Sequence, residues 1–222
     1  MAMYPWNIAA GFVRVSLLEL IPPPAADQKD SMKTLFLIHH SHTDIGYTTA
    51  QANVRRNQIG FIRQVLDILR RQGLQCGFKW VCESFWSVEQ FLLEATEEEK
   101  LRFEEAVRAG AIGLSGNYAN FSELLGFSAM SRLTARASAY GRQIGHPVVS
   151  AMNADINGFG WGYGKALVKN GVNNLFTCIH THHGMYPLQR HQPFWWVGPE
   201  GEKLLVWNGE HYHLGYELGL AP

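Results

Sequence analysis

Short apolar runs alternate with stretches of helical periodicity along most of this chain, and this alternation limits its fold more than any other feature. Residues 34–39 (TLFLIH) form a continuous apolar run, as in a strand that is buried on both faces. Residues 53–72 place their apolar side chains at helical spacing and end at Gly73. The same patterns predict further strands at 78–82, 111–115, 148–152 and 175–179, and helices at 87–109, 128–144 and 161–170. Five strand–helix units predict an α/β fold with a parallel sheet or (β/α) barrel.

Both ends of the chain depart from this alternation. Residues 22–31 (PPPAADQKDS) have the composition of a linker, so we expect residues 1–31 to form an extension without a fold. Residues 32–222 are then the barrel domain. Near the other end, the segments 194–198 (FWWVG) and 203–209 (KLLVWNG) are separated by PEGE, which predicts a β-hairpin inserted in a loop of the barrel.

The composition excludes several classes of protein. Nineteen Lys and Arg balance nineteen Asp and Glu, without a segment that concentrates either sign, which argues against nucleic acid as a partner. Three cysteines without paired short spacing indicate neither a disulfide framework nor a zinc knuckle, as in a cytoplasmic protein. The first 24 residues lack a basic start and an unbroken apolar run, so we expect neither export nor a membrane partner.

The strongest chemical signal follows the first predicted strand. In parallel α/β folds ligands bind at the carboxyl ends of strands, and there His40, His42 and Asp44 stand at alternate positions of one segment. Imidazole nitrogens and carboxylate oxygens are good zinc ligands, and a catalytic zinc site takes three of them. We expect His42 and Asp44 to bind the metal, with Asp155 from the end of another strand as third ligand. The alternative is that both histidines are hydrogen-bonded core residues and Asp44 is a turn residue.

Other polar and aromatic side chains also follow predicted strands and are candidates for a substrate cleft. A second histidine cluster, at 180–183, fits the lining of a cleft better than a second metal site. The candidates for substrate binding are His40, Trp86, Asn117, Trp161 and His182. For the tryptophans, packing in the core is the simpler alternative.

Two of these segments together resemble a known family, the family 38 glycoside hydrolases (α-mannosidase-like). His42-Thr43-Asp44 is similar to the HxD element that follows the first strand in that family, although Ile45-Gly46-Tyr47 replaces the usual Asn, Asp, Pro, Gly and Trp. The segment 153–161 (NADINGFGW) is similar to the family's second element, with Phe159-Gly160 displaced by two residues. These departures indicate a divergent member whose preferred glycoside need not be a mannoside.

The resemblance implies a zinc-dependent, retaining glycosidase acting on a carbohydrate substrate. Zn²⁺ held by His42, Asp44 and Asp155 would contact adjacent sugar hydroxyls, and Asp155 would also be the catalytic nucleophile that forms a glycosyl-enzyme. In the family, the acid/base and a fourth zinc ligand lie well downstream of the nucleophile. We therefore predict that this chain is the amino-terminal part of an incomplete barrel, whose exposed apolar edges favour self-association. The carboxylates near strand ends are Glu83, Glu123 and Glu210, none of which the sequence identifies as the acid.

Two other classes of function fit the same residues. A metal-dependent deacetylase or amidohydrolase also places His and Asp at strand ends, but there Asp155 would be a base or a ligand and would never be glycosylated. A non-catalytic carbohydrate-binding or interaction protein on a decayed barrel is the other alternative.

Overall fold

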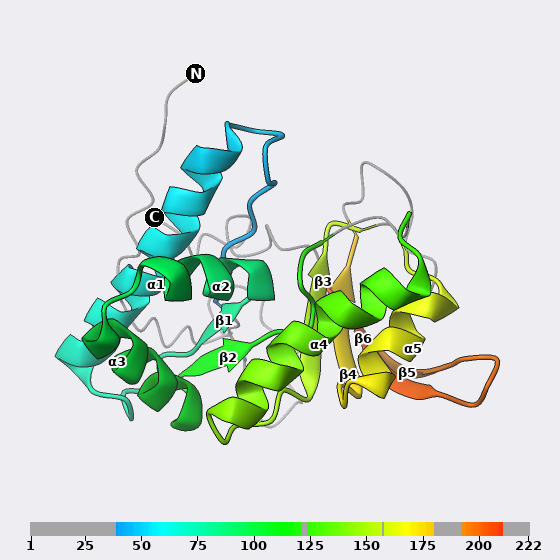
Figure 1. Ribbon diagram of the computed structural model, residues 1–222. Helices are drawn as coiled ribbons and strands as arrows, with labels where there is room; N and C mark the ends of the chain where they lie inside the picture. The colour runs from blue at the N-terminus through cyan, green and yellow to red at the C-terminus, as the bar shows by residue number, and fades with distance from the viewer. Residues whose placement is uncertain (1–38, 121–123, 157, 180–191, 211–222) are drawn as a thin grey trace, which may run out of the picture.

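The computed structural model describes residues 39–120, 124–156, 158–179 and 192–210, which form a mixed α/β fold (Figure 1). The predicted extension at 1–31 and all but the last residue of the predicted strand at 34–39 lie outside these ranges. Helix and strand alternate as predicted. The elements are α1 (Gln51–Gln72), β1 (Trp80–Cys82), α2 (Phe85–Glu94), α3 (Glu97–Arg108), β2 (Ile112–Leu114), α4 (Phe127–Gln143), β3 (Ser150–Ala154), α5 (Trp161–Lys169), β4 (Asn174–Cys178), β5 (Gln192–Val197) and β6 (Lys203–Asn208).

The strands form two small sheets in which most pairs are parallel. β1 pairs with β2 in parallel, and His39 makes a parallel bridge to Trp80, so the end of the predicted first strand lies beside β1. The second sheet has the order β3-β4-β6-β5, in which β3, β4 and β6 are parallel. The predicted hairpin of β5 and β6 is present. It is not a simple insertion, however, because β6 continues the parallel sheet through its pairing with β4.

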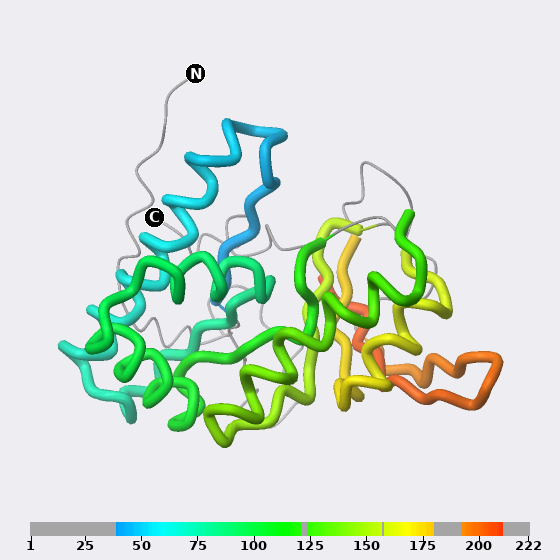
Figure 2. The backbone as a smooth tube through the Cα atoms, viewed as in Figure 1, coloured from blue at the N-terminus to red at the C-terminus, as the bar shows by residue number. Residues whose placement is uncertain are grey.

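A short seam joins the two sheets between β2 and β3. The Gly116 N–H donates to the Ser150 carbonyl (2.9 Å), and the Met152 N–H donates to the Ser115 hydroxyl (2.9 Å). Figure 1 shows the two sheets side by side, and the tube in Figure 2, in the same view, shows α1, α2 and α3 at the end of the molecule that holds the first sheet and α5 at the end that holds the second. The described strands do not close into a barrel, so the predicted barrel is confirmed only as parallel α/β structure.

The helices bury a large apolar core against these sheets, and Met152, Ala154 and Cys178 form a second, smaller cluster. Where one or two helices were predicted at 87–109, the chain forms two, since Thr96 begins α3 with a capping box: its hydroxyl accepts from the Glu99 N–H, and the Glu99 carboxylate accepts from the Thr96 N–H. The rings of Phe91 in α2 and Phe103 in α3, both fully buried, lie 5.3 Å apart between centroids. Among the helices within the described ranges, none is long and apolar enough to cross a membrane.

Two helical glycines are expected to respond in opposite ways to alanine. A Cβ at Gly141 in α4 would lie 2.6 Å from the His146 carbonyl oxygen and 2.8 Å from the Val148 side chain, so Gly141→Ala should lower the free energy of unfolding by about 1–3 kcal/mol. A Cβ at Gly60 in α1 meets no atom within 4 Å, so Gly60→Ala should raise it by about 0.5–1 kcal/mol. Urea denaturation of both variants checks this, and equal effects at the two positions would contradict the packing argument.

Candidate metal-binding and active site

Polar side chains gather at the carboxyl ends of the parallel strands. The segment 40–44 follows His39, which is bridged to β1, and Glu83 directly follows β1 itself. Asn120 lies beyond the end of β2, and Asp155 directly follows β3. Since parallel strands all end at the same edge of a sheet, residues far apart in the sequence meet here. The position of the site is therefore a direct result of the parallel topology.

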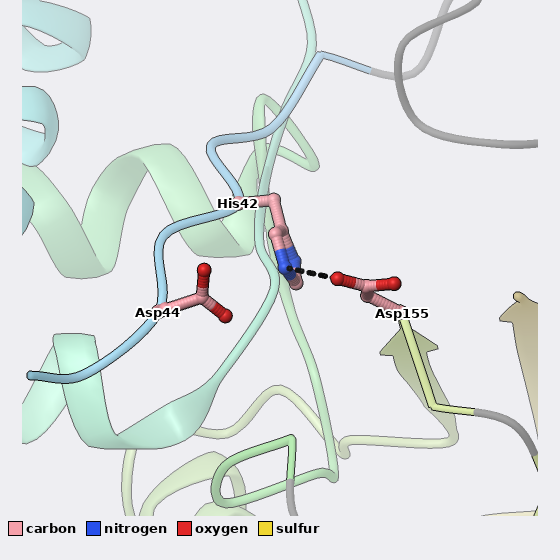
Figure 3. Close-up of side chains that lie close together, drawn as sticks. All are labelled: His42, Asp44 and Asp155. Atoms are coloured by element: carbon pink, nitrogen blue, oxygen red, sulfur yellow. Dashed lines mark ion pairs between the residues drawn. The ribbon is translucent and has the colours of Figure 1, made fainter. Parts of the chain in front are cut away.

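The structure brings together the three residues predicted to bind metal. Each of His42, Asp44 and Asp155 offers a ligand atom, and these atoms all lie within 4.8 Å of one another (Figure 3). The His42 Nε2 atom lies 3.7 Å from the Asp155 Oδ2 atom. Ligand atoms around a tetrahedral zinc ion with bonds of about 2.0–2.1 Å lie roughly 3.4 Å apart. One nitrogen and two carboxylates at these separations fit a zinc ion after small side-chain adjustments.

Asp155 adopts an uncommon backbone conformation. Its φ is +60°, and it is the one non-glycine residue with positive φ in the described part of the chain. Its N–H donates to the Cys178 carbonyl (2.9 Å), which fixes this turn against the end of β4. Aspartate tolerates the left-handed region better than most residues, but the conformation still costs free energy, and residues held in such conformations cluster at functional sites. The turn directs the Asp155 carboxylate towards His42 (Figure 3).

Glu83 contributes to the site in a way that the sequence did not predict. One oxygen of its carboxylate lies 2.7 Å from His40 Nδ1, the other lies 2.7 Å from His42 Nδ1, and the Asn120 amide also donates to it. Burial raises the pKa of Glu83, but the hydrogen bonds from His40 and His42 outweigh burial and lower this pKa to about 2. Glu83 is therefore ionised at neutral pH.

The carboxylates around His42 also change its titration. Burial lowers the pKa of His42, whereas the hydrogen bond to Glu83 and the charges of Asp155 and Asp44 raise it, and the net pKa lies above the usual histidine value. An excess of negative charge therefore surrounds this imidazole. Such a site attracts a cation, and a divalent metal ion satisfies the same carboxylates more fully than one proton does.

A small pocket of about 270 Å³ opens beside the cluster. It is lined in part by His42, Asp44, Glu83, Trp86 and Asn120. Most of the lining side chains are polar, and two are large and aromatic, Tyr47 and Trp86. Sugar-binding pockets use the same combination, with hydrogen-bonding groups for the hydroxyls and a flat face for the ring.

The structure brings only some of the predicted substrate-binding residues to this pocket. Trp86 lines the pocket. His40 is not part of the pocket lining, and its ring is hydrogen-bonded to the Glu83 carboxylate. Asn117 is only 1% exposed, and its amide donates to Asn120 and to the Met152 carbonyl, so it holds the seam together rather than facing a ligand. Trp161, at the start of α5, is 62% exposed and is not part of the pocket lining. His182 lies outside the described residues.

Comparison with known proteins gives a family match and a set of similar folds. Residues 32–216 match the family model for the glycosyl hydrolases family 38 N-terminal domain. No curated protein matches the chain in sequence. One similar structure is a protein in glycosyl hydrolase family 38 from Enterococcus faecalis, with a TM-score of 0.59 and 14% identity over 80% of this chain and 19% of that chain.

Two other solved structures share the fold. An alpha-mannosidase from Enterococcus faecalis V583 has a TM-score of 0.62 and 17% identity over 77% of this chain and 19% of its own. The 4-alpha-glucanotransferase from Thermococcus litoralis has a TM-score of 0.58 and 15% identity over 83% of this chain and 28% of its own. At such identities the likeness establishes the fold alone. The match covers only 19–28% of the length of these proteins.

Proposed function

This chain belongs to glycosyl hydrolase family 38, because the family's N-terminal domain model matches residues 32–216, and from this premise we propose that it carries the zinc-binding and nucleophile half of a retaining glycosidase. The observation that carries the proposal is the convergence of His42, Asp44 and Asp155 at one strand edge. We propose an α-mannoside-like glycoside as substrate, in keeping with the similar alpha-mannosidase fold.

The parallel strands support a barrel as the full architecture. Following their contacts, the order runs from His39 through β1, β2, the seam, β3 and β4 to β6. This is also their order along the chain, as in a (β/α) barrel, where each strand lies beside the next. We propose that the described strands form an arc of such a barrel. We likewise propose that the protein is cytoplasmic and that it self-associates.

The residues divide the chemistry among them. His42, Asp44 and Asp155 would hold a zinc ion, which when bound supplies electrophilic contacts to adjacent sugar hydroxyls and so orients the ring. An Asp155 carboxylate oxygen then bonds to the anomeric carbon as the bond to the leaving oxygen breaks. Trp86 would support one face of the sugar from the side of the pocket.

Retention of configuration requires a second carboxyl group, which gives its proton to the leaving oxygen and later takes one from water. Glu83 is unsuited to this role. Its side chain is only 5% exposed, it is shared by His40 and His42, and a pKa of about 2 keeps it ionised. We therefore place the acid/base at a carboxyl group outside this cluster.

A fluorinated α-mannosyl fluoride tests the proposed nucleophile. Ring fluorine slows formation and hydrolysis of the glycosyl-enzyme, and fluoride departs without protonation, so the reaction does not depend on the acid. With zinc present, we expect peptide mass spectrometry to find one sugar attached at Asp155. Asp155→Asn should abolish the label, whereas Asp67→Asn, on the exposed face of α1, should retain it.

A zinc-loaded chain that takes up no label would contradict the role of Asp155 as nucleophile. Zinc-dependent hydrolysis of an N-acetyl sugar by that same chain would then favour the deacetylase class.

A further inference from the structure

One buried carboxylate holds two imidazole rings. Glu83 Oε2 lies 2.7 Å from His40 Nδ1, and Glu83 Oε1 lies 2.7 Å from His42 Nδ1. All three side chains are largely buried: Glu83 is 5% exposed, His40 is 11% exposed and His42 is 9% exposed. The Asn120 side-chain amide donates to the same Oε1, which holds the carboxylate from the β2 side. Glu83 is thus fixed at both oxygens, and the rings cannot rotate without breaking one of these bonds.

This arrangement determines which nitrogen of each ring carries its proton. An ionised carboxylate only accepts hydrogen bonds, so the Nδ1 atoms of His40 and His42 must both donate. In the neutral ring the proton then sits on Nδ1, and Nε2 presents its lone pair. In His42 this Nε2 is the atom that lies 3.7 Å from Asp155 Oδ2, inside the cluster with Asp44. The lone pair therefore points where a metal ion would bind.

We propose that Glu83 is a positioning residue that fixes both His40 and His42 as Nδ1–H tautomers and thereby presents His42 Nε2 to the metal site. The tautomer assignment rests on the two hydrogen bonds to the Glu83 carboxylate, whereas its benefit to metal binding rests on the proposed function. A carboxylate behind a metal-binding histidine orients the ring and strengthens its bond to the metal, and loss of such a partner commonly weakens metal binding about 10–100-fold.

The matched substitutions are Glu83→Gln and Glu89→Gln. Glutamine keeps the size of Glu83, but it can offer an acceptor oxygen to only one ring while its amide nitrogen requires an acceptor from the other. Glu89 in α2 is the control because it also has two side-chain partners, Tyr118 and Arg136, and does not contact the cluster.

The decisive measurement is a long-range proton–nitrogen NMR spectrum of the metal-free chain at alkaline pH, where both rings are neutral, with signals assigned through His40→Gln and His42→Gln. We expect Nδ1–H tautomers for both rings in the wild type and in Glu89→Gln, and loss of that tautomer in at least one ring of Glu83→Gln. In a parallel zinc titration against a competing chelator, Glu83→Gln should raise the Kd about 10–100-fold.

Nε2–H tautomers in the wild type, or tautomers and zinc affinity unchanged in Glu83→Gln, would overturn the role of Glu83. Expected tautomers in a wild type that binds no zinc would instead reject the proposed metal centre and leave the assignment of Glu83 intact.

Discussion

Asp44→Ala and Asp155→Ala are each expected to abolish stoichiometric zinc binding, raising the Kd for zinc by at least about a hundredfold. Each substitution removes one of the three groups whose ligand atoms lie within 4.8 Å of one another, and two remaining protein ligands do not make a catalytic zinc site. Metal content of the purified chains by mass spectrometry, followed by a competitive titration, gives the comparison.

The control for this pair is Asp67→Ala. Asp67 lies on α1, its side chain is 58% exposed, and its ion pair with Arg70 involves none of the three proposed metal ligands. We expect this variant to keep one equivalent of zinc. If the wild type binds no zinc, or if Asp44→Ala and Asp155→Ala bind it as tightly as the control does, the proposed site is wrong and the carbohydrate-binding alternative gains support.

Phe91→Ala is expected to lower the free energy of unfolding by about 3–5 kcal/mol, a large part of the stability of an ordinary domain. Phe91 is fully buried, and its ring lies against that of Phe103, so truncation leaves a cavity between α2 and α3. Urea denaturation followed by circular dichroism measures the change.

Leu93 provides the control on the same helix. It is 74% exposed, so Leu93→Ala should change the free energy of unfolding by no more than about 0.5 kcal/mol. Similar losses in the two variants would show that α2 does not pack as described.

Much of the fold could be predicted from the sequence because most helices and strands have a recognisable pattern of apolar residues within their own segment. The helical spacing of apolar residues placed α1, α4 and α5 within two residues of their observed bounds. The role of β6 could not be predicted in this way. Its sequence, KLLVWN, pairs equally well with a hairpin partner or with a parallel neighbour, and the pairing with β4 is a tertiary contact that periodicity does not reveal.

In the candidate site, too, some residues could be predicted from local sequence patterns and others could not. His42 and Asp44 occupy alternate positions of one segment, and Asp155 follows another strand. Their convergence could be predicted because the carboxyl ends of parallel strands lie at the same edge of a sheet. The sequence identifies Glu83 only as one of several carboxylates near strand ends, because a glutamate between a strand and a helix is common and has no distinctive pattern around it. Its signal was its place at the same strand edge as two histidines that each need an acceptor.

Asn117 and Trp161 show that a position after a strand end does not by itself predict a place in the site. Both follow predicted strands, yet one is buried in the seam and the other is exposed at the start of α5. Nearness to a strand end does not say in which direction a side chain points, since that direction depends on the path of the loop.

The seam between β2 and β3 has a consequence for the order of folding. His42 and Asp44 lie before it in the chain, and Asp155 lies after it, more than a hundred residues from His42. The contacts that join neighbouring strands close much shorter loops, of 32 residues between Trp80 and Ile112 in β1–β2 and of 34 residues between Gly116 and Ser150 at the seam, so no single step has to close the whole loop from His42 to Asp155. The ligands therefore meet only when the seam has formed, and an ion held across it would resist reopening of the chain at that point.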